Sequence, residues 1–344
     1  MNLRSLSPRF WILGLALALV SVESLRTGPL GTAGFDALWN AFAPSKALSG
    51  VPAGTPELRD ILLQLRAPRL LVGILAGADL ALAGLILQTL FLNPLADAYV
   101  VGVSSGASLG AVSALCLGFQ MGAWGINPVS GCAFAGAMLA LLAVVALTQR
   151  GRHASSASLL LGGLCVGALA QSVSTLLLIR SGNEQLRSAL GWLMGSLAYR
   201  DWADVRALLP ASLLGIAGAW AMRDTLNLLA MGSASAHHLG IDVRGAHRRL
   251  VAIAALLASA AVSVCGLIGF IGLVVPNLLR LWSGPNHRSL IPLSLIGGAL
   301  LLTLADVLNR RSFPAEELPV GILTGVLGAL FLLGFMQRRA APRP

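Results

Sequence analysis

Long apolar stretches separated by short polar turns dominate the chain. Residues 98–149 contain no charged side chain, and residues 250–279 form a second uncharged run. A helix needs roughly 20 residues to cross the hydrocarbon core of a membrane. The pattern therefore predicts an all-α polytopic membrane protein with about ten transmembrane helices. The expected spans, with ragged edges, are residues 10–28, 67–91, 97–118, 128–149, 156–179, 203–222, 249–266, 268–282, 289–307 and 317–337.

The uncharged run at 250–279 is too long for one crossing, because a single helix of that length would measure about 45 Å. Gly266, Gly269 and Gly272, with Pro276 beyond them, predict a break within it. We therefore expect two helices around a tight turn. A shorter apolar segment near 186–199 cannot span the bilayer, and we expect it to lie at the interface or to re-enter the membrane.

Composition supports one transmembrane domain over residues 1–344. Hydrophobic residues make up 56% of the chain and charged residues 11%, whereas soluble proteins carry about 25% charged residues. The net charge of +10 comes almost wholly from arginines in short loops, which favours lipid and protein partners over nucleic acid. The basic, then apolar, N-terminus is similar to a secretory signal, and we expect it to remain as the first helix. The distribution of basic residues weakly favours cytoplasmic tails at both chain ends.

No metal centre, cofactor or catalytic residue is expected. The four cysteines are scattered through apolar spans without a C-x-x-C pair. Gly102 to Gly106 matches the G-x-S-x-G nucleophile motif, but no embedded base accompanies Ser104 to support an intramembrane hydrolase. His237 and His238 are adjacent and so point different ways on a helix, as expected of solvated or partner-facing side chains. The phosphate-binding motif G-x-x-x-x-G-K-S/T is absent from the sequence, so ATP hydrolysis would require a separate subunit.

Asp79 is unusual because it lies near the middle of the second expected span. An ionisable group at that depth is costly and is normally paired or facing water. Two roles remain open: a structural hydrogen bond to a neighbouring helix, and a place on a transport pathway. The second role would suit a secondary transporter driven by an ion gradient, with Asp79 as the proton site.

Four sequence blocks resemble one transporter family. They are R-A-P-R with Q-T-L-F-L-N-P-L-A-D between residues 66 and 97, G-V-S-S-G-A at 102–107, G-L-I-G-F-I-G-L-V-V-P-N-L-L-R with N-H-R between 266 and 288, and A-D-V-L-N-R with E-L-P-V-G-I-L-T between 305 and 324. These blocks are similar to the permease subunits of bacterial ATP-binding-cassette (ABC) importers for iron-siderophores, haem and cobalamin, the FecCD-type or type II importers. The resemblance covers about residues 55–337.

This resemblance implies a permease in the bacterial cytoplasmic (inner) membrane, working by alternating access. The implied partners are a second permease subunit, identical or paralogous, two cytoplasmic ATPase subunits, an extracytoplasmic substrate-binding protein, and membrane lipid. The implied substrate is a metal chelate, with an iron-siderophore as the commonest case and haem or cobalamin as alternatives. The chain itself would not be an enzyme.

The resemblance also implies a docking role for Arg66, Arg69 and Arg310, which match arginines that receive acidic side chains of the binding protein. Arginine suits this task because its forked guanidinium is always charged and pairs well with carboxylates. Snorkelling to the membrane interface is the structural alternative. Under the docking hypothesis, reversing Arg66 and Arg69 to Glu should weaken docking and leave expression intact.

The loop at about 223–249 matches the segment that couples the permease to its ATPase. The residues expected to make this coupling contact are Met231, Gly232, Ala236, Leu239 and Gly240. A short helix on a rigid loop can pass nucleotide-driven closure to the spans as rigid-body motion. The residues after the first glycine, 233–235, lack the acidic residues common in the family, which leaves the polar contacts open.

Candidates for the pathway or its gates are Asp79, Gln88, Asn93, Ser104 and Ser105. Gln88 and Asn93, like Asp97, match the family well, and side-chain hydrogen bonds that tie the turn between two helices are the structural alternative to gating. Asn277 departs from the family, which commonly has His after this proline, so a His-dependent role is not expected there.

Overall fold

The computed structural model describes residues 8–28, 31–32, 58–98, 102–119, 127–149, 156–313 and 318–340. The outermost residues of both chain ends, where cytoplasmic tails are expected, lie outside the described residues, as does Glu317. The elements are α1 (Pro8–Arg26), β1 (Thr27–Gly28), β2 (Gly31–Thr32), α3 (Leu58–Asp60), the π-helix η2 (Ile61–Arg66), α4 (Ala67–Leu90), α5 (Val103–Cys116), α6 (Pro128–Gln149), α7 (Ser156–Arg180), α8 (Asn183–Leu193), α9 (Trp202–Ala221), α10 (Arg223–Leu229), α11 (Ser233–His238), α12 (Val243–Cys265), α13 (Ile271–Ser283), α14 (His287–Ser312) and α15 (Val320–Ala340).

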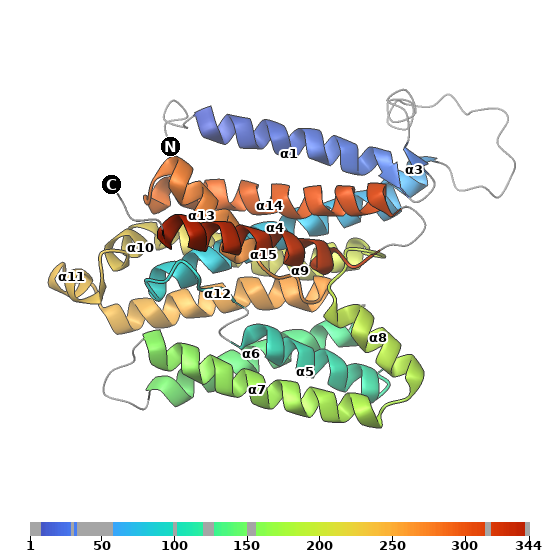
Figure 1. Ribbon diagram of the computed structural model, residues 1–344, viewed down its shortest axis with the longest axis horizontal. Coiled ribbons are helices and arrows are strands. Elements are labelled where there is room, and N and C mark those ends of the chain that lie inside the picture. The colour runs from blue at the N-terminus through green and yellow to red at the C-terminus, as the bar shows by residue number, and fades with distance from the viewer. Residues whose placement is uncertain are drawn as a thin grey trace, which may run out of the picture.

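The helices run alongside one another, with α4 at the centre (Figure 1). α4 packs against α9, α12, α13 and α14, whereas α1 lies along the outer side of α14. In its most apolar stretch the α4 span is 83% buried, compared with 6% for α1. A helix that is hydrophobic all round is stable only when surrounded. α4 is therefore surrounded by protein, and α1 is left to face lipid.

Glycines allow α4 to approach its neighbours closely. A Cβ on Gly77 would lie 2.4 Å from the carbonyl oxygen of Gly298 in α14, and one on Gly84 would lie 2.0 Å from that of Gly272 in α13. Small residues at such crossings bring backbones together where lipid offers no hydrophobic driving force. The many glycines thus give a tightly packed bundle.

The helices are compatible with the expected spans. Among the described residues, five helices are long and apolar enough to cross a membrane, and α9 with α10 forms a sixth candidate bent by 59°. Four shorter apolar helices complete the set: Val103–Cys116, Pro128–Val144, Ile271–Ser283 and Val320–Gly334. α5 begins six residues after the expected edge, and α12 begins six residues early because helix continues through the basic residues before 250.

The predicted break in the long uncharged run is confirmed. Helix α12 ends at Cys265 and α13 begins at Ile271. Gly266 and Phe270 flank the break with positive φ angles of 73° and 69°, which for Phe270 is an uncommon conformation. Pro276 lies inside α13 rather than at the break.

Candidate functional site

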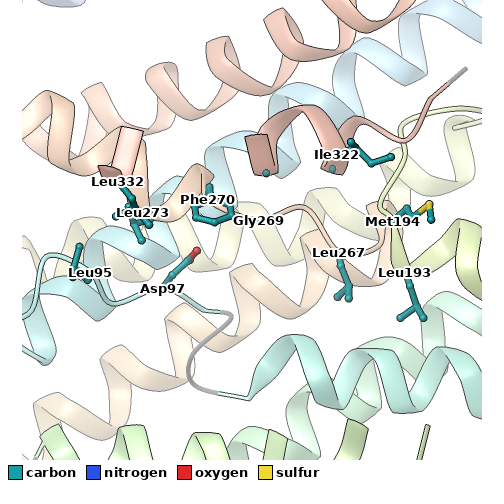
Figure 2. A pocket seen from close by; sticks show the side chains of 12 residues that line it. Leu95, Asp97, Leu193, Met194, Leu267, Gly269, Phe270, Leu273, Ile322 and Leu332 are labelled. Atoms are coloured by element: carbon teal, nitrogen blue, oxygen red, sulfur yellow. The ribbon is translucent and has the colours of Figure 1, made fainter. Parts of the chain in front are cut away.

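A partly open cavity of about 570 Å³ lies where the break between α12 and α13 meets α8 and α15. Its lining is Leu95, Asp97, Leu193, Met194, Leu267, Gly269, Phe270, Leu273, Gly321, Ile322, Gly325 and Leu332. Figure 2 shows these side chains around the space, with Asp97 on the side of Phe270 and Gly269. Asp97 carries the one charge among the described lining residues. The cavity is therefore an apolar compartment with a single acidic side chain.

Asp97 joins the turn after α4 to the start of α13. Its Oδ1 accepts a hydrogen bond from the backbone N–H of Ala98 at 2.7 Å, and its carboxyl group also accepts one from the N–H of Phe270. The N-cap residue of α13, Phe270, makes no side-chain hydrogen bond to the N–H groups of the first turn. The first N–H groups of a helix need an acceptor, and the helix dipole favours a negative charge there. Asp97 supplies this acceptor from a distant part of the sequence.

Two amide side chains complete the connection between this turn and α13. Gln88 Nε2 donates to the carbonyl oxygen of Gly272 at 2.9 Å. Asn277 Nδ2 donates to the carbonyl oxygens of Pro94 at 2.6 Å and Leu273 at 2.8 Å. The asparagine that departs from the family therefore has a defined partner in the turn. Together with the Asp97 contacts, these bonds hold the turn after α4 against the start of α13, beside the cavity.

None of the predicted pathway residues, Gln88 included, is part of the cavity lining. Asn93 Oδ1 accepts from the N–H of Leu95 at 3.0 Å, which closes the turn locally. Ser104 is buried, and its hydroxyl has no hydrogen-bond partner within the part of the chain that the structure describes. Ser105 faces Gly167 of α7, where a Cβ would lie 3.1 Å from its Oγ. Their pathway roles stay predictions, and the geometry gives Asn93 and Ser105 structural contacts.

Asp79 is fully buried between α4 and α9. Ser212 Oγ, itself buried in α9, donates to Asp79 Oδ2 at 2.6 Å and also lies 3.1 Å from the carbonyl oxygen of Leu208. Asp79 Oδ1 has no hydrogen-bond partner among the described residues. Asp79 does not line the cavity. Of the two roles left open by the sequence, this geometry favours the interhelical hydrogen bond.

The three predicted docking arginines gather where α4 begins and α14 ends, and two of them cap the end of α1. Arg66 Nη1 donates to the carbonyl oxygens of Leu25 at 2.7 Å and Arg26 at 2.8 Å. Arg310 Nη1 donates to the carbonyl oxygens of Ser24 and Thr27. The last carbonyls of a helix lack intrahelical partners, and cations are favoured near them. These arginines therefore hold the first helix against the bundle.

Asp306 links Arg69 to Arg310. Arg69 Nη2 lies 2.8 Å from Asp306 Oδ1, and Arg310 Nη2 lies 2.9 Å from Asp306 Oδ2. Asp306 is 3% exposed, Arg66 8% and Arg310 5%. The sequence did not single out Asp306, although its spacing four residues before Arg310 is typical of a helical ion pair. Docking stays a prediction, and burial gives these arginines a structural role in the chain itself.

The predicted coupling residues lie on and around α11, at the end of the bundle opposite α3 and α8 (Figure 1). Gly232 and Gly240 flank α11 with φ angles of 102° and 83°, which only glycine adopts easily. Ala236 is fully buried, whereas Met231 and Leu239 are 67% and 59% exposed. The segment thus presents exposed apolar side chains on both sides of a short helix, as a partner-binding surface would.

Three residues that meet beside α10 had no role assigned from the sequence: Thr89, Asn227 and His287. His287 stands in the N-H-R block, and its ring contacts side chains from both α4 and α10. Only the fold brings these three together, because they come from distant parts of the chain. Among the described residues, no group of three or more His, Cys, Asp and Glu side chains could hold a metal ion.

Known proteins share this sequence pattern and this architecture. The model of the FecCD transport family matches residues 15–338. The chain belongs to the FecCD transport family. The cobalamin import system permease protein BtuC of Halobacterium salinarum is 42% identical to this FecCD chain over 83% of the chain and 76% of the relative. The hemin transport system permease protein HmuU of Yersinia pestis is 37% identical over 98% of both chains.

A solved structure of a metal-chelate type ABC transporter in an inward-facing conformation has a TM-score of 0.82, with 28% identity, and covers 96% of this chain and 98% of its own. This FecCD-family chain is thus an all-α membrane permease with the fold of ABC importers. The family identified from four sequence blocks is confirmed.

Proposed function

We propose that this FecCD-family permease forms the membrane pathway of an ABC importer that carries a bulky metal chelate into the cell. The observation that carries the proposal is the cavity beside the broken span, bounded by α8, α13 and α15. Its volume of about 570 Å³ lies within the range of small-molecule sites, about 300–1,000 Å³. An almost entirely apolar wall suits a substrate that must pass without being held tightly.

The relatives support a chelate of the haem or cobalamin class as cargo, since these are the substrates in their names. The iron-siderophore expected from the sequence remains the third candidate. All three are large metal complexes. The single acidic lining residue, Asp97, is occupied in capping α13, so it leaves the wall with little charge to offer the substrate.

The two ends of the bundle support the proposed partners. Exposed apolar side chains flank α11 at one end, where two ATPase subunits would bind, one on each permease of a dimer. Arg66, Arg69 and Arg310 lie at the opposite end, where a substrate-binding protein would dock. In this proposal the ATPase subunits lie in the cytoplasm of a bacterial cell, the binding protein lies outside the cytoplasmic membrane, and both chain ends are cytoplasmic.

The alternative is a secondary transporter in which Asp79 carries a proton. The burial of Asp79 between α4 and α9, away from the cavity lining, argues against it. A proton site that drives transport must exchange protons with water on each side of the membrane in turn. The hydrogen bond to Ser212 supplies a structural reason for an acid at this depth.

Uptake into vesicles tests the proposal. The permease would be reconstituted with the ATPase and binding protein encoded by neighbouring genes and offered haem, cobalamin or a ferric siderophore. ATP-dependent uptake of one chelate that stops when the binding protein is left out supports the proposal and identifies the cargo. Failure of all three chelates in vesicles where the ATPase is active would contradict the proposed substrate class.

A further inference from the structure

The buried imidazole of His287 connects the coupling end of the molecule to the helix that precedes the cavity wall. His287 is the first residue of α14 and is 2% exposed. Its Nδ1 lies 2.9 Å from Asn227 Oδ1 in α10, and its Nε2 lies 2.8 Å from Thr89 Oγ1 near the end of α4. One side chain thus bridges α10 and α4, two elements far apart in the sequence.

The surrounding bonds define the direction of each contact. The backbone N–H of His287 donates to Asn227 Oδ1 at 2.8 Å, which identifies that atom as the amide oxygen. Since an amide oxygen only accepts, the ring proton lies on Nδ1, and Nε2 of the neutral ring accepts from the Thr89 hydroxyl. The Thr89 hydroxyl also lies 2.9 Å from the carbonyl oxygen of Leu85.

Each end of this bridge continues into a working part of the molecule. Asn227 lies in α10, which leads directly into α11, and Asp224 of α10 makes a second link to α14 through Arg288 at 2.9 Å. Thr89 follows Gln88, whose amide holds the Gly272 carbonyl at the break beside the cavity. The path from α11 to the cavity wall is therefore a series of short contacts.

We propose that the Asn227–His287–Thr89 contact is the positioning link through which movement of the coupling segment reaches the cavity wall. The inference rests on the proposed function, because it assumes that a partner moves α11. When α10 shifts, the two hydrogen bonds from His287 to Asn227 carry the N-terminus of α14 with it, and the bond to Thr89 pulls the end of α4. The Gln88 and Asp97 bonds then pass this displacement to the start of α13.

Thr89→Val tests the link with almost no change in side-chain shape. The matched control is Thr303→Val, because Thr303 is likewise a buried threonine in a membrane helix, and its own hydroxyl donates within that helix to the carbonyl four residues earlier. Thr89→Ser keeps the hydroxyl and should rescue the loss. Asn227→Leu tests the contact on the other side of the ring. Asn227→Asp is its control, because aspartate retains an acceptor for both His287 contacts.

The measurement is the number of substrate molecules taken up per ATP hydrolysed in vesicles containing the complete importer. We expect Thr89→Val and Asn227→Leu to lower this ratio about fivefold, the factor that corresponds to one ordinary hydrogen bond of about 1 kcal/mol. ATP hydrolysis itself should continue, and Thr303→Val, Thr89→Ser and Asn227→Asp should keep the wild-type ratio. A merely structural role would lower transport and hydrolysis together in proportion to lost protein.

Three results would overturn the link. The first is an unchanged ratio in Thr89→Val and Asn227→Leu, and the second is a ratio that falls equally in Thr303→Val; both leave the proposed function standing if the wild type still imports. The third is a wild-type complex that hydrolyses ATP without any uptake, which removes the proposed function and the link with it. If Thr89→Val does not reach the membrane, the comparison of Asn227→Leu with Asn227→Asp tests the link by itself.

Discussion

The hydrogen bond between Ser212 and Asp79 should stabilise the packing of α4 against α9. Its 2.6 Å length and complete burial make it a strong example of an interhelical bond. Interhelical hydrogen bonds in a membrane contribute on average about 0.6 kcal/mol and at most about 1.7 kcal/mol. Because this bond is short and one of its partners is a carboxyl group, we expect a value near the upper end, about 1–1.7 kcal/mol.

A double-mutant cycle measures this value. Ser212→Ala, Asp79→Leu and the double variant would be compared with the wild type by reversible unfolding in mixed micelles. Ser212→Ala leaves the Asp79 carboxyl without its partner and should cost about 1–3 kcal/mol. Asp79→Asn keeps a polar group of the same shape and should cost less than about 1 kcal/mol.

The transport activity of Asp79→Asn separates the two roles of Asp79. We expect a folded variant that imports at the wild-type rate, because an amide can replace the carboxyl group in a structural hydrogen bond. Two results would refute this reasoning. One is a coupling energy near zero in the cycle, and the other is a fully folded Asp79→Asn that no longer transports.

Three further variants test the packing at the ends and the centre of the bundle. Asp306→Asn removes the carboxylate shared by the buried Arg310 and the partly buried Arg69 and should lower the free energy of unfolding by about 3 kcal/mol or more, measured by the same unfolding assay. Arg66→Glu should sharply reduce the yield of folded protein, because its carboxylate would face the C-terminal carbonyls of α1; the exposed Arg59→Glu is its control, and equal yields would contradict the capping role. Gly84→Ala should lower stability by about 1–3 kcal/mol through overpacking, whereas Gly14→Ala, with nothing within 4 Å of the new Cβ, should leave the melting temperature unchanged or higher.

The docking arginines show where sequence reasoning stops. Their position at the outer end of two helices could be predicted from the spacing of apolar spans. The direction of the guanidinium groups could not, because the carbonyls that Arg66 and Arg310 bind belong to the end of α1 and the residue after it, 40 to 286 residues away along the chain. The structure therefore changes the expected effect of reversing Arg66: expression should suffer, and docking must be judged from exposed positions.

The broken span was predictable because its signal is local, whereas the coupling role of the α11 segment comes from the family resemblance and stays a prediction. Glycines with positive φ mark both the start of the break, at Gly266, and the two ends of α11, at Gly232 and Gly240. The bridge at His287 had no such signal. Its three members come from α4, α10 and α14, and only the packing of these helices brings them together.

The energy source for transport is the most direct test of the account. Vesicles holding the permease, its ATPase and its binding protein would be assayed for chelate uptake with ATP and without a proton gradient, and then with a proton gradient and without ATP. The account predicts uptake in the first condition only, lost when the binding protein is omitted. Uptake that follows the proton gradient and ignores ATP would contradict it and return Asp79 to the centre of the mechanism.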